Sequence, residues 1–310
     1  MFDFSINYNT LVVLLGTSLL GACSGMIGSF AVLRRQALLG DALAHAALPG
    51  LCLAFMLLGE RNLPAMLTGA LVTGLLGVSI VAGLRRFTRI KEDAAIGIVL
   101  SVFFGAGFAL SRWIQNQTTT GSKAGLDSYI LGKTAGMIAS DVYWIGGAAL
   151  VCLLVVMLVY KEFKLVAFDT GFASVQGLPA AWLDLLLMAL IAVTVVLGLP
   201  AVGVVLMAAL LILPGAAARF WTDRLGRMVL ISALFGVAIG AIGTAISARY
   251  SGMPAGPVIV LVGTALFLIS VLFAPRRGGI ARWLEQARFI RDLRAGRATF
   301  DEFAPDLPSK

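Results

Sequence analysis

The chain has 310 residues, of which 59% are hydrophobic and only 13% are charged, and its formal net charge is +8. This composition excludes a soluble domain, because repeated apolar runs of about 20 residues are typical of a polytopic helical membrane protein. The basic residues stand in short loops between the apolar runs, so we expect the positive charge to set the topology, and we expect no nucleic-acid partner.

The apolar runs predict an all-α transmembrane domain over residues 1–275, with about nine membrane-spanning helices, eight being possible. The expected spans are roughly 10–33, 38–58, 64–84, 93–111, 137–160, 181–199, 202–213, 228–248 and 255–274. The N-terminus has no basic region, so the first run is expected to be a retained span and not a cleavable signal peptide.

Three segments of this plan are less regular. A short re-entrant or interfacial helix is expected at 127–132, inside a polar loop, and Pro200 allows a sharp external turn. The seventh run is short, is expected to stop at Pro214–Gly215, and could be a half-helix. Residues 276–310 are expected to form a charged cytoplasmic tail with a short amphipathic helix.

The distribution of basic residues predicts the orientation. Nineteen of the 24 Lys and Arg fall in segments that this plan places in the cytoplasm, which puts the N-terminus outside and the C-terminus inside. The cysteines Cys23, Cys52 and Cys152 all stand in apolar runs without pair-like spacing. They are expected to be buried free thiols, with neither a disulfide framework nor a zinc site.

The second span holds the main candidate site. His45 is the only histidine of the chain, and Asp41 precedes it by four residues, which places both side chains on one face of a helix. An ionisable pair inside a membrane segment is costly and indicates function, and carboxylate plus imidazole suits a divalent transition metal. Pro49 and Gly50 predict a kink in this pore-lining helix near the His45 carbonyl. Alternatively, Asp41 is a helix N-cap and His45 a lone polar residue bonded to a neighbouring helix.

The stretch Gly40–Gly50, GDALAHAALPG, resembles the permease family of bacterial ABC importers for zinc, manganese and iron. The resemblance covers roughly residues 10–275. Other stretches agree with it, namely 93–98, 168–169 with 177–179, 201–203 and 253–257.

The resemblance implies a type II ABC importer-like permease in the bacterial inner membrane. In that family two permeases, identical or paralogous, form the pore, two cytoplasmic ATPases drive it, and an external solute-binding protein delivers manganese, zinc or iron. Asp41 and His45 match the family's proposed metal site. No permanently bound cofactor is implied, and the transported ion is the substrate.

The segment 214–227 resembles the coupling helix of the wider importer class, and residues 168–179 are a candidate secondary contact with the ATPase. The residues expected to contact the ATPase are Pro214, Gly215, Arg219, Phe220, Trp221 and Arg224. The chain has no GxxxxGK[ST] motif, so it is not expected to be an enzyme, and ATP hydrolysis is expected on a separate subunit.

Three other functions compete with metal import. A permease for a siderophore or cobalamin shares the architecture but needs no close Asp/His pair. An intramembrane metal-dependent hydrolase needs further ligands, and this chain has no HExxH motif. Its main other acid near a span, Asp184, is expected to cap the sixth helix. A purely structural membrane scaffold is the third alternative.

Overall fold

The computed structural model describes residues 8–59, 62–117, 132, 134–250, 253–275, 278–280 and 283. All regular secondary structure within these residues is helical. The elements in chain order are α1 (Tyr8–Leu33), α2 (Ala37–Leu58), α3 (Leu63–Phe87), α4 (Glu92–Gln117), the 3-10 turn η2 (Thr134–Gly136), α6 (Ala139–Leu158), α7 (Tyr160–Phe168), α8 (Thr170–Val175), α9 (Ala180–Trp221), α10 (Leu225–Arg249) and α11 (Ala255–Phe273).

The predicted all-α membrane architecture is confirmed. Eight stretches of the described residues are long and apolar enough to cross a membrane, and Leu206–Trp221 is a shorter apolar helix. The fourth helix has Glu92 and Asp93 in its first turn, where negative charges interact favourably with the helix dipole. It continues to Gln117, beyond the predicted end of the span at 111. The helices predicted at 127–132 and within the tail lie almost entirely outside the described residues.

The long element α9 contains two helices that fold back on each other. The chain turns at Gly203, whose φ of 79° and ψ of 170° are accessible to glycine but not to other residues without strain. A Cβ on Gly198 would lie 2.3 Å from the Met207 sulfur, so the limbs before and after the turn face each other. The turn expected at Pro200 therefore falls at Gly203, whereas Pro200 stays helical.

The returning limb of α9 is longer than predicted. The sequence plan stopped this helix at Pro214–Gly215, and that prediction is wrong, because the helix continues through Pro214 to Trp221. A proline is tolerated inside a membrane helix where neighbouring helices pack against it. Here the Pro214 ring contacts α1 beside Gly25, and both Pro214 and Gly215 are buried.

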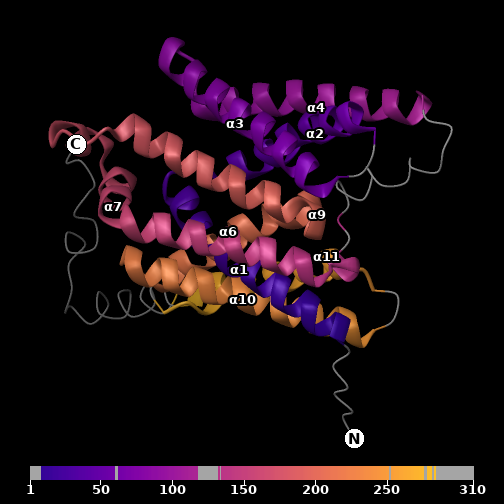
Figure 1. Ribbon diagram of the computed structural model, residues 1–310. Coiled ribbons are helices and arrows are strands. Elements are labelled where there is room, and N and C mark those ends of the chain that lie inside the picture. Colours follow the sequence, from indigo (N-terminus) through magenta and orange to yellow (C-terminus); the bar gives the residue numbers. More distant parts are fainter. Residues whose placement is uncertain are drawn as a thin grey trace, which may run out of the picture.

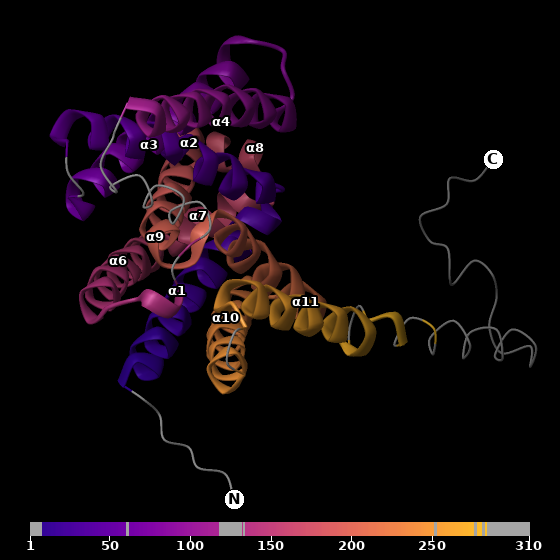
Figure 2. The same cartoon turned by 90° about the vertical axis from the view of Figure 1, so that its right-hand side faces the viewer.

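The helices form two groups on either side of α9. In Figure 1 the long helices lie side by side, with α7 near one end of the bundle. Figure 2 shows α2, α3 and α4 grouped together on one side of α9, and α10 and α11 on the other. The helix α1 packs mainly on α10 and α9, whereas α2 packs on α3, α4 and α9. The bundle core thus lies around α9 and α1.

Small residues allow the closest helix contacts. Gly21 of α1 meets Gly236 of α10, where an added Cβ on Gly21 would lie 2.2 Å from the Gly236 carbonyl oxygen. Such close backbone approach is how helices associate in lipid, since the hydrophobic effect provides little driving force there. The cysteines Cys23, Cys52 and Cys152 are free and buried, as predicted.

Candidate metal site

The predicted pair is brought together on the first half of α2. The Asp41 Oδ1 and the His45 Nε2 are 3.7 Å apart, and both side chains lie on one face, one helical turn from each other. The Asp41 side chain is 41% exposed and that of His45 is 21% exposed. Gln36, not Asp41, occupies the N-cap position of α2, so Asp41 is available for another role.

His45 is held by an aromatic neighbour and not by a polar one. Its ring meets the Phe104 ring of α4 edge-on, with centroids 4.7 Å apart and an interplanar angle of 77°. Phe104 in turn lies 6.1 Å from Phe108. The His45 Nδ1 is buried and has no hydrogen-bond partner. An imidazole in an apolar wall, with one nitrogen near a carboxylate, is suited to bind a metal ion.

The geometry of the pair fits a divalent transition metal. Carboxylate oxygen and imidazole nitrogen each bind such ions at about 2.0–2.2 Å, so two ligand atoms 3.7 Å apart can touch the same ion without any movement of the helix. Within the described residues no group of three or more His, Cys, Asp and Glu side chains could hold a metal ion. The pair therefore offers two candidate ligand atoms, fewer than a transition metal requires.

The back of α2 is packed by small residues inside the protomer. Gly50 lies against α3, where an added Cβ would be 2.1 Å from the Gly69 carbonyl oxygen. Pro49 lies within the continuous helix α2, next to Gly107 of α4. The small residues near the pair thus allow α2 to pack closely on α3 and α4 of the same chain. The apolar side chains of α2 and α4 that remain exposed include Leu38, Leu53, Val102, Phe104 and Phe108.

The residues predicted to couple to the ATPase do not form a separate surface helix. Phe220 packs on Phe267 of α11, with ring centroids 6.0 Å apart. The Trp221 indole nitrogen donates a hydrogen bond of 3.1 Å to the Ser270 hydroxyl of α11. Both aromatic side chains therefore contact the bundle, while Arg219 is half-buried and Arg224 is exposed at the start of α10.

The short helices α7 and α8, a predicted secondary contact with the ATPase, expose apolar side chains. Phe168 is 57% exposed, Phe172 51% and Val175 85%. The sequence carried a signal for this surface, because Phe168-Asp169 and the following Gly-Leu-Pro are among the stretches that resemble the family. In the structure Asp169 caps α8 by accepting a hydrogen bond from the Phe172 N–H. An exposed apolar rim on a short helix between two spans is typical of a docking surface.

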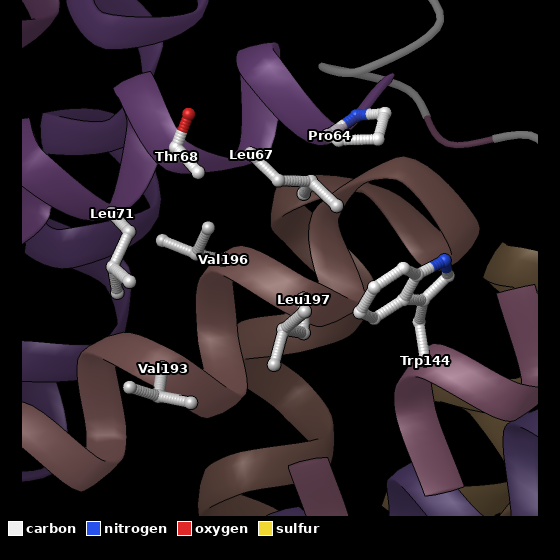
Figure 3. A pocket seen from close by; sticks show the side chains of 8 residues that line it. All are labelled: Pro64, Leu67, Thr68, Leu71, Trp144, Val193, Val196 and Leu197. Atoms are coloured by element: carbon white, nitrogen blue, oxygen red, sulfur yellow. The ribbon is translucent and has the colours of Figure 1, made fainter. Parts of the chain in front are cut away.

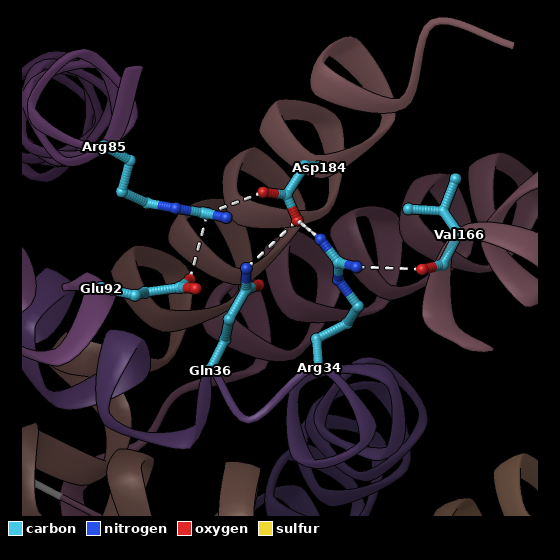
Figure 4. Close-up of polar contacts among 6 residues, drawn as sticks. All are labelled: Arg34, Gln36, Arg85, Glu92, Val166 and Asp184. Carbon is cyan, nitrogen blue, oxygen red and sulfur yellow. Dashed lines mark hydrogen bonds and ion pairs between the residues drawn. The ribbon is translucent and has the colours of Figure 1, made fainter. Parts of the chain in front are cut away.

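Asp184 does not cap the helix that contains it, so that prediction is wrong. Pro179 holds the N-cap position of α9, and the Asp184 carboxylate instead pairs with Arg34 and Arg85. These contacts, drawn in Figure 4, connect residues far apart in the sequence, which no local pattern predicts.

A separate apolar cavity of about 220 Å³ lies between α3, α6 and α9. Figure 3 shows the Trp144 indole and branched aliphatic side chains converging on it. Its lining offers no carboxylate, imidazole or thiol, so it is not a metal site. The lining residues are Pro64, Leu67, Thr68, Leu71, Trp144, Val193, Val196 and Leu197.

Comparison with known proteins gives a consistent result. The sequence profile of the ABC 3 transport family matches residues 7–274. The manganese transport system membrane protein MntC of Bacillus subtilis is 47% identical over 283 residues, which cover 91% of this chain but 65% of MntC. The zinc transport system membrane protein TroC of Treponema pallidum is 45% identical, over 88% of this chain and 91% of TroC.

A solved structure agrees with these sequence matches. PsaBC from Streptococcus pneumoniae, in complex with a Fab, has a TM-score of 0.77 and 30% sequence identity, and the match covers 91% of this chain and 96% of that one. The similarity in fold therefore extends over nearly the whole bundle described above.

Proposed function

The chain belongs to the ABC 3 transport family, and on that premise we propose that it is the membrane permease subunit of an ATP-driven importer of manganese, zinc or iron. The observation that carries the proposal is the half-exposed pair of Asp41 and His45, 3.7 Å apart in an otherwise apolar wall. An ion that leaves water for this wall loses its hydration, and the carboxylate and imidazole replace part of it.

A second permease copy or a paralogue completes the pore in this proposal. One protomer supplies two ligands, and the metals in question take four or more. Two α2 helices facing each other across a pore would offer two carboxylates and two imidazoles. The exposed apolar side chains of α2 and α4, among them Val102 and Phe108, support this, since an apolar rim around a polar centre suits a protein interface.

The other partners follow from the same proposal. A cytoplasmic ATP-binding cassette subunit hydrolyses ATP, and an external solute-binding protein delivers the ion to the pore. The permease lies in the bacterial inner membrane with its N-terminus outside, the orientation that the excess of basic residues in the predicted cytoplasmic segments supports. Transport needs no permanently bound cofactor.

We place the main ATPase contact on α8 and keep the segment ending at Arg224 as a neighbouring contact. Phe172 and Val175 are 51% and 85% exposed, whereas Phe220 packs on α11 and Trp221, 37% exposed, contacts both α10 and α11. An exposed apolar side chain can enter a groove of the ATPase at no cost to the bundle. Of the six predicted coupling residues, Trp221 and Arg224 are exposed and so remain available to a partner.

The test is metal uptake into proteoliposomes that hold the complete complex with its binding protein. Radiolabelled manganese, zinc and iron are supplied separately to the wild type and to Asp41→Asn and His45→Ala. Asp93→Asn is the matched control, because Asp93 is an exposed carboxylate in the first turn of α4 and not on α2.

We expect the wild type and the control to take up one of these metals and both site variants to lose that uptake. Uptake that survives both substitutions would remove the pair from the pathway. A fully assembled wild-type complex that transports none of the three metals would contradict the proposed function itself.

A further inference from the structure

A cluster of charged and polar side chains joins the ends of helices that are far apart in the sequence (Figure 4). We call Asp184, Arg34, Gln36, Arg85 and Glu92 the Asp184 cluster. The Asp184 Oδ1 accepts hydrogen bonds from Arg34 at 2.6 Å and from the Gln36 amide at 3.1 Å, and its Oδ2 accepts one from Arg85 at 2.7 Å. Arg85 also donates to Glu92 at 3.1 Å. Three donors thus converge on one carboxylate.

The cluster is built into the protein interior. The side chains of Asp184 and Arg34 are each 13% exposed, and Gln36 is fully buried. Charges at that depth are stable only when each is paired and hydrogen-bonded, and removal of one partner leaves the others uncompensated. The arrangement is therefore more specific than a surface ion pair, whose contribution is small.

One side of the cluster fixes the start of the metal-binding helix. Arg34 and Gln36 flank Arg35, which has a left-handed φ of 59°, a strained conformation for a residue other than glycine. Gln36 is the N-cap residue of α2, yet its side chain makes no cap and is directed to Asp184 instead. Asp41 follows Gln36 by five residues on the same helix. The direction in which α2 leaves this turn therefore depends on Asp184.

The other side of the cluster connects to the exposed helix α8. The Leu178 N–H donates a hydrogen bond to the Ala173 carbonyl, and the Gly177 N–H donates one to the Ser174 carbonyl. These two bonds close a turn at the end of α8, which requires the left-handed φ of 80° at Gly177. Pro179 then starts α9, whose second turn carries Asp184. Arg34 is also tied to α7, through a 2.9 Å hydrogen bond to the Val166 carbonyl. A displacement of α8 is thus transmitted to Asp184 through hydrogen-bonded backbone.

We propose that Asp184 is a positioning residue that passes the movement of α7 and α8 to the Gln36 end of α2, and so links ATP hydrolysis to release of the ion from Asp41 and His45. This inference rests on the proposed function and adds a coupling residue to it. Helices joined by a hydrogen-bonded cluster can transmit a displacement from one site to another, provided that both sites shift the position of the same helix. The helix α2 is that element.

The experiment compares wild type, Asp184→Asn and Asp184→Glu in proteoliposomes with the complete complex, and measures ATP hydrolysis and metal uptake in the same samples. For Asp184→Asn we expect ATP hydrolysis to continue while the metal delivered per ATP falls about 2- to 30-fold, and for Asp184→Glu we expect partial recovery. A merely structural role would lower both activities together and leave their ratio unchanged. Asp141→Asn, which removes a carboxylate that caps α6, is the control for such a general loss.

A second variant keeps the test decisive where Asp184→Asn fails to fold. Gln36→Met removes only the amide that joins Asp184 to α2, has similar volume, and leaves all four charges paired. We expect it to lower the metal-to-ATP ratio in the same direction. An unchanged metal-to-ATP ratio in Gln36→Met, or in a folded Asp184→Asn, would overturn this inference. The proposed function would still stand in that case, as long as the wild type takes up metal. Absence of wild-type uptake counts against the function instead.

Discussion

Adding one methyl group at Gly107 should impair transport by moving α2 away from α4. In the structure a Cβ at Gly107 would lie 2.8 Å from the Leu48 Cβ and 3.0 Å from the Pro49 Cδ. Carbon atoms in ordinary contact are about 3.5–4.0 Å apart, so Gly107→Ala requires the two helices to separate by roughly 1 Å. Overpacking of this kind costs about 1–3 kcal/mol. The change falls three residues from Phe104, the residue against which His45 packs.

A shift of about 1 Å at a binding site can lower a rate about 100-fold, because ligand positions must hold to a few tenths of an ångström. We therefore expect Gly107→Ala to lower both the thermal unfolding midpoint and metal uptake, the latter by about tenfold or more. Gly147→Ala is the control, since a Cβ at Gly147 of α6 would meet no atom within 4 Å. Uptake and unfolding of Gly107→Ala equal to those of the control would refute the role given to this contact.

Three other substitutions test neighbouring parts of the argument. Phe104→Ala removes the edge-on contact with His45, worth about 0.5–1.5 kcal/mol, and should weaken metal binding about 2- to 12-fold in a calorimetric titration, whereas Phe104→Tyr should not. Gly203→Ala places a side chain where φ is 79° and should destabilise the bundle by about 1–3 kcal/mol, measured by thermal unfolding. Val175→Glu puts a charge on the exposed rim of α8 and should reduce the amount of ATPase that copurifies, more than Arg224→Glu does. The opposite order of the last two would return the main contact to the segment ending at Arg224.

The parts of the fold that could be predicted are those encoded locally. Each membrane span is one continuous apolar run, so length and hydropathy locate it, and the Asp41–His45 contact follows from a spacing of four residues on one helix. The free, buried cysteines likewise follow from their positions in apolar runs. In each case the residues that decide the outcome are close together in the sequence.

The errors have the opposite cause. Pro214 was expected to end a helix, because an isolated helix loses a hydrogen bond and gains a clash there, but packing against α1 keeps it helical. Asp184 was expected to cap its own helix, and its partners Arg34 and Arg85 are about 150 and 99 residues away. Phe220 and Trp221 pack on α11 and α10, and their expected contact with the ATPase stays a prediction. Tertiary contacts decided each of these outcomes.

The packing of α2 also bears on how an ion could be released. The helix is closely packed on α3 at Gly50 and on α4 at Pro49, so these two adjacent residues anchor it to its neighbours. Asp41 and His45 lie between this anchor and the Gln36 end, one helical turn apart on the continuous helix α2. In the proposed dimeric pore, release would follow from movement of α2 relative to the ligands of the second permease, because loss of those ligands would leave only two. The Gln36 end, held by the Asp184 cluster, is where such a movement is most directly imposed.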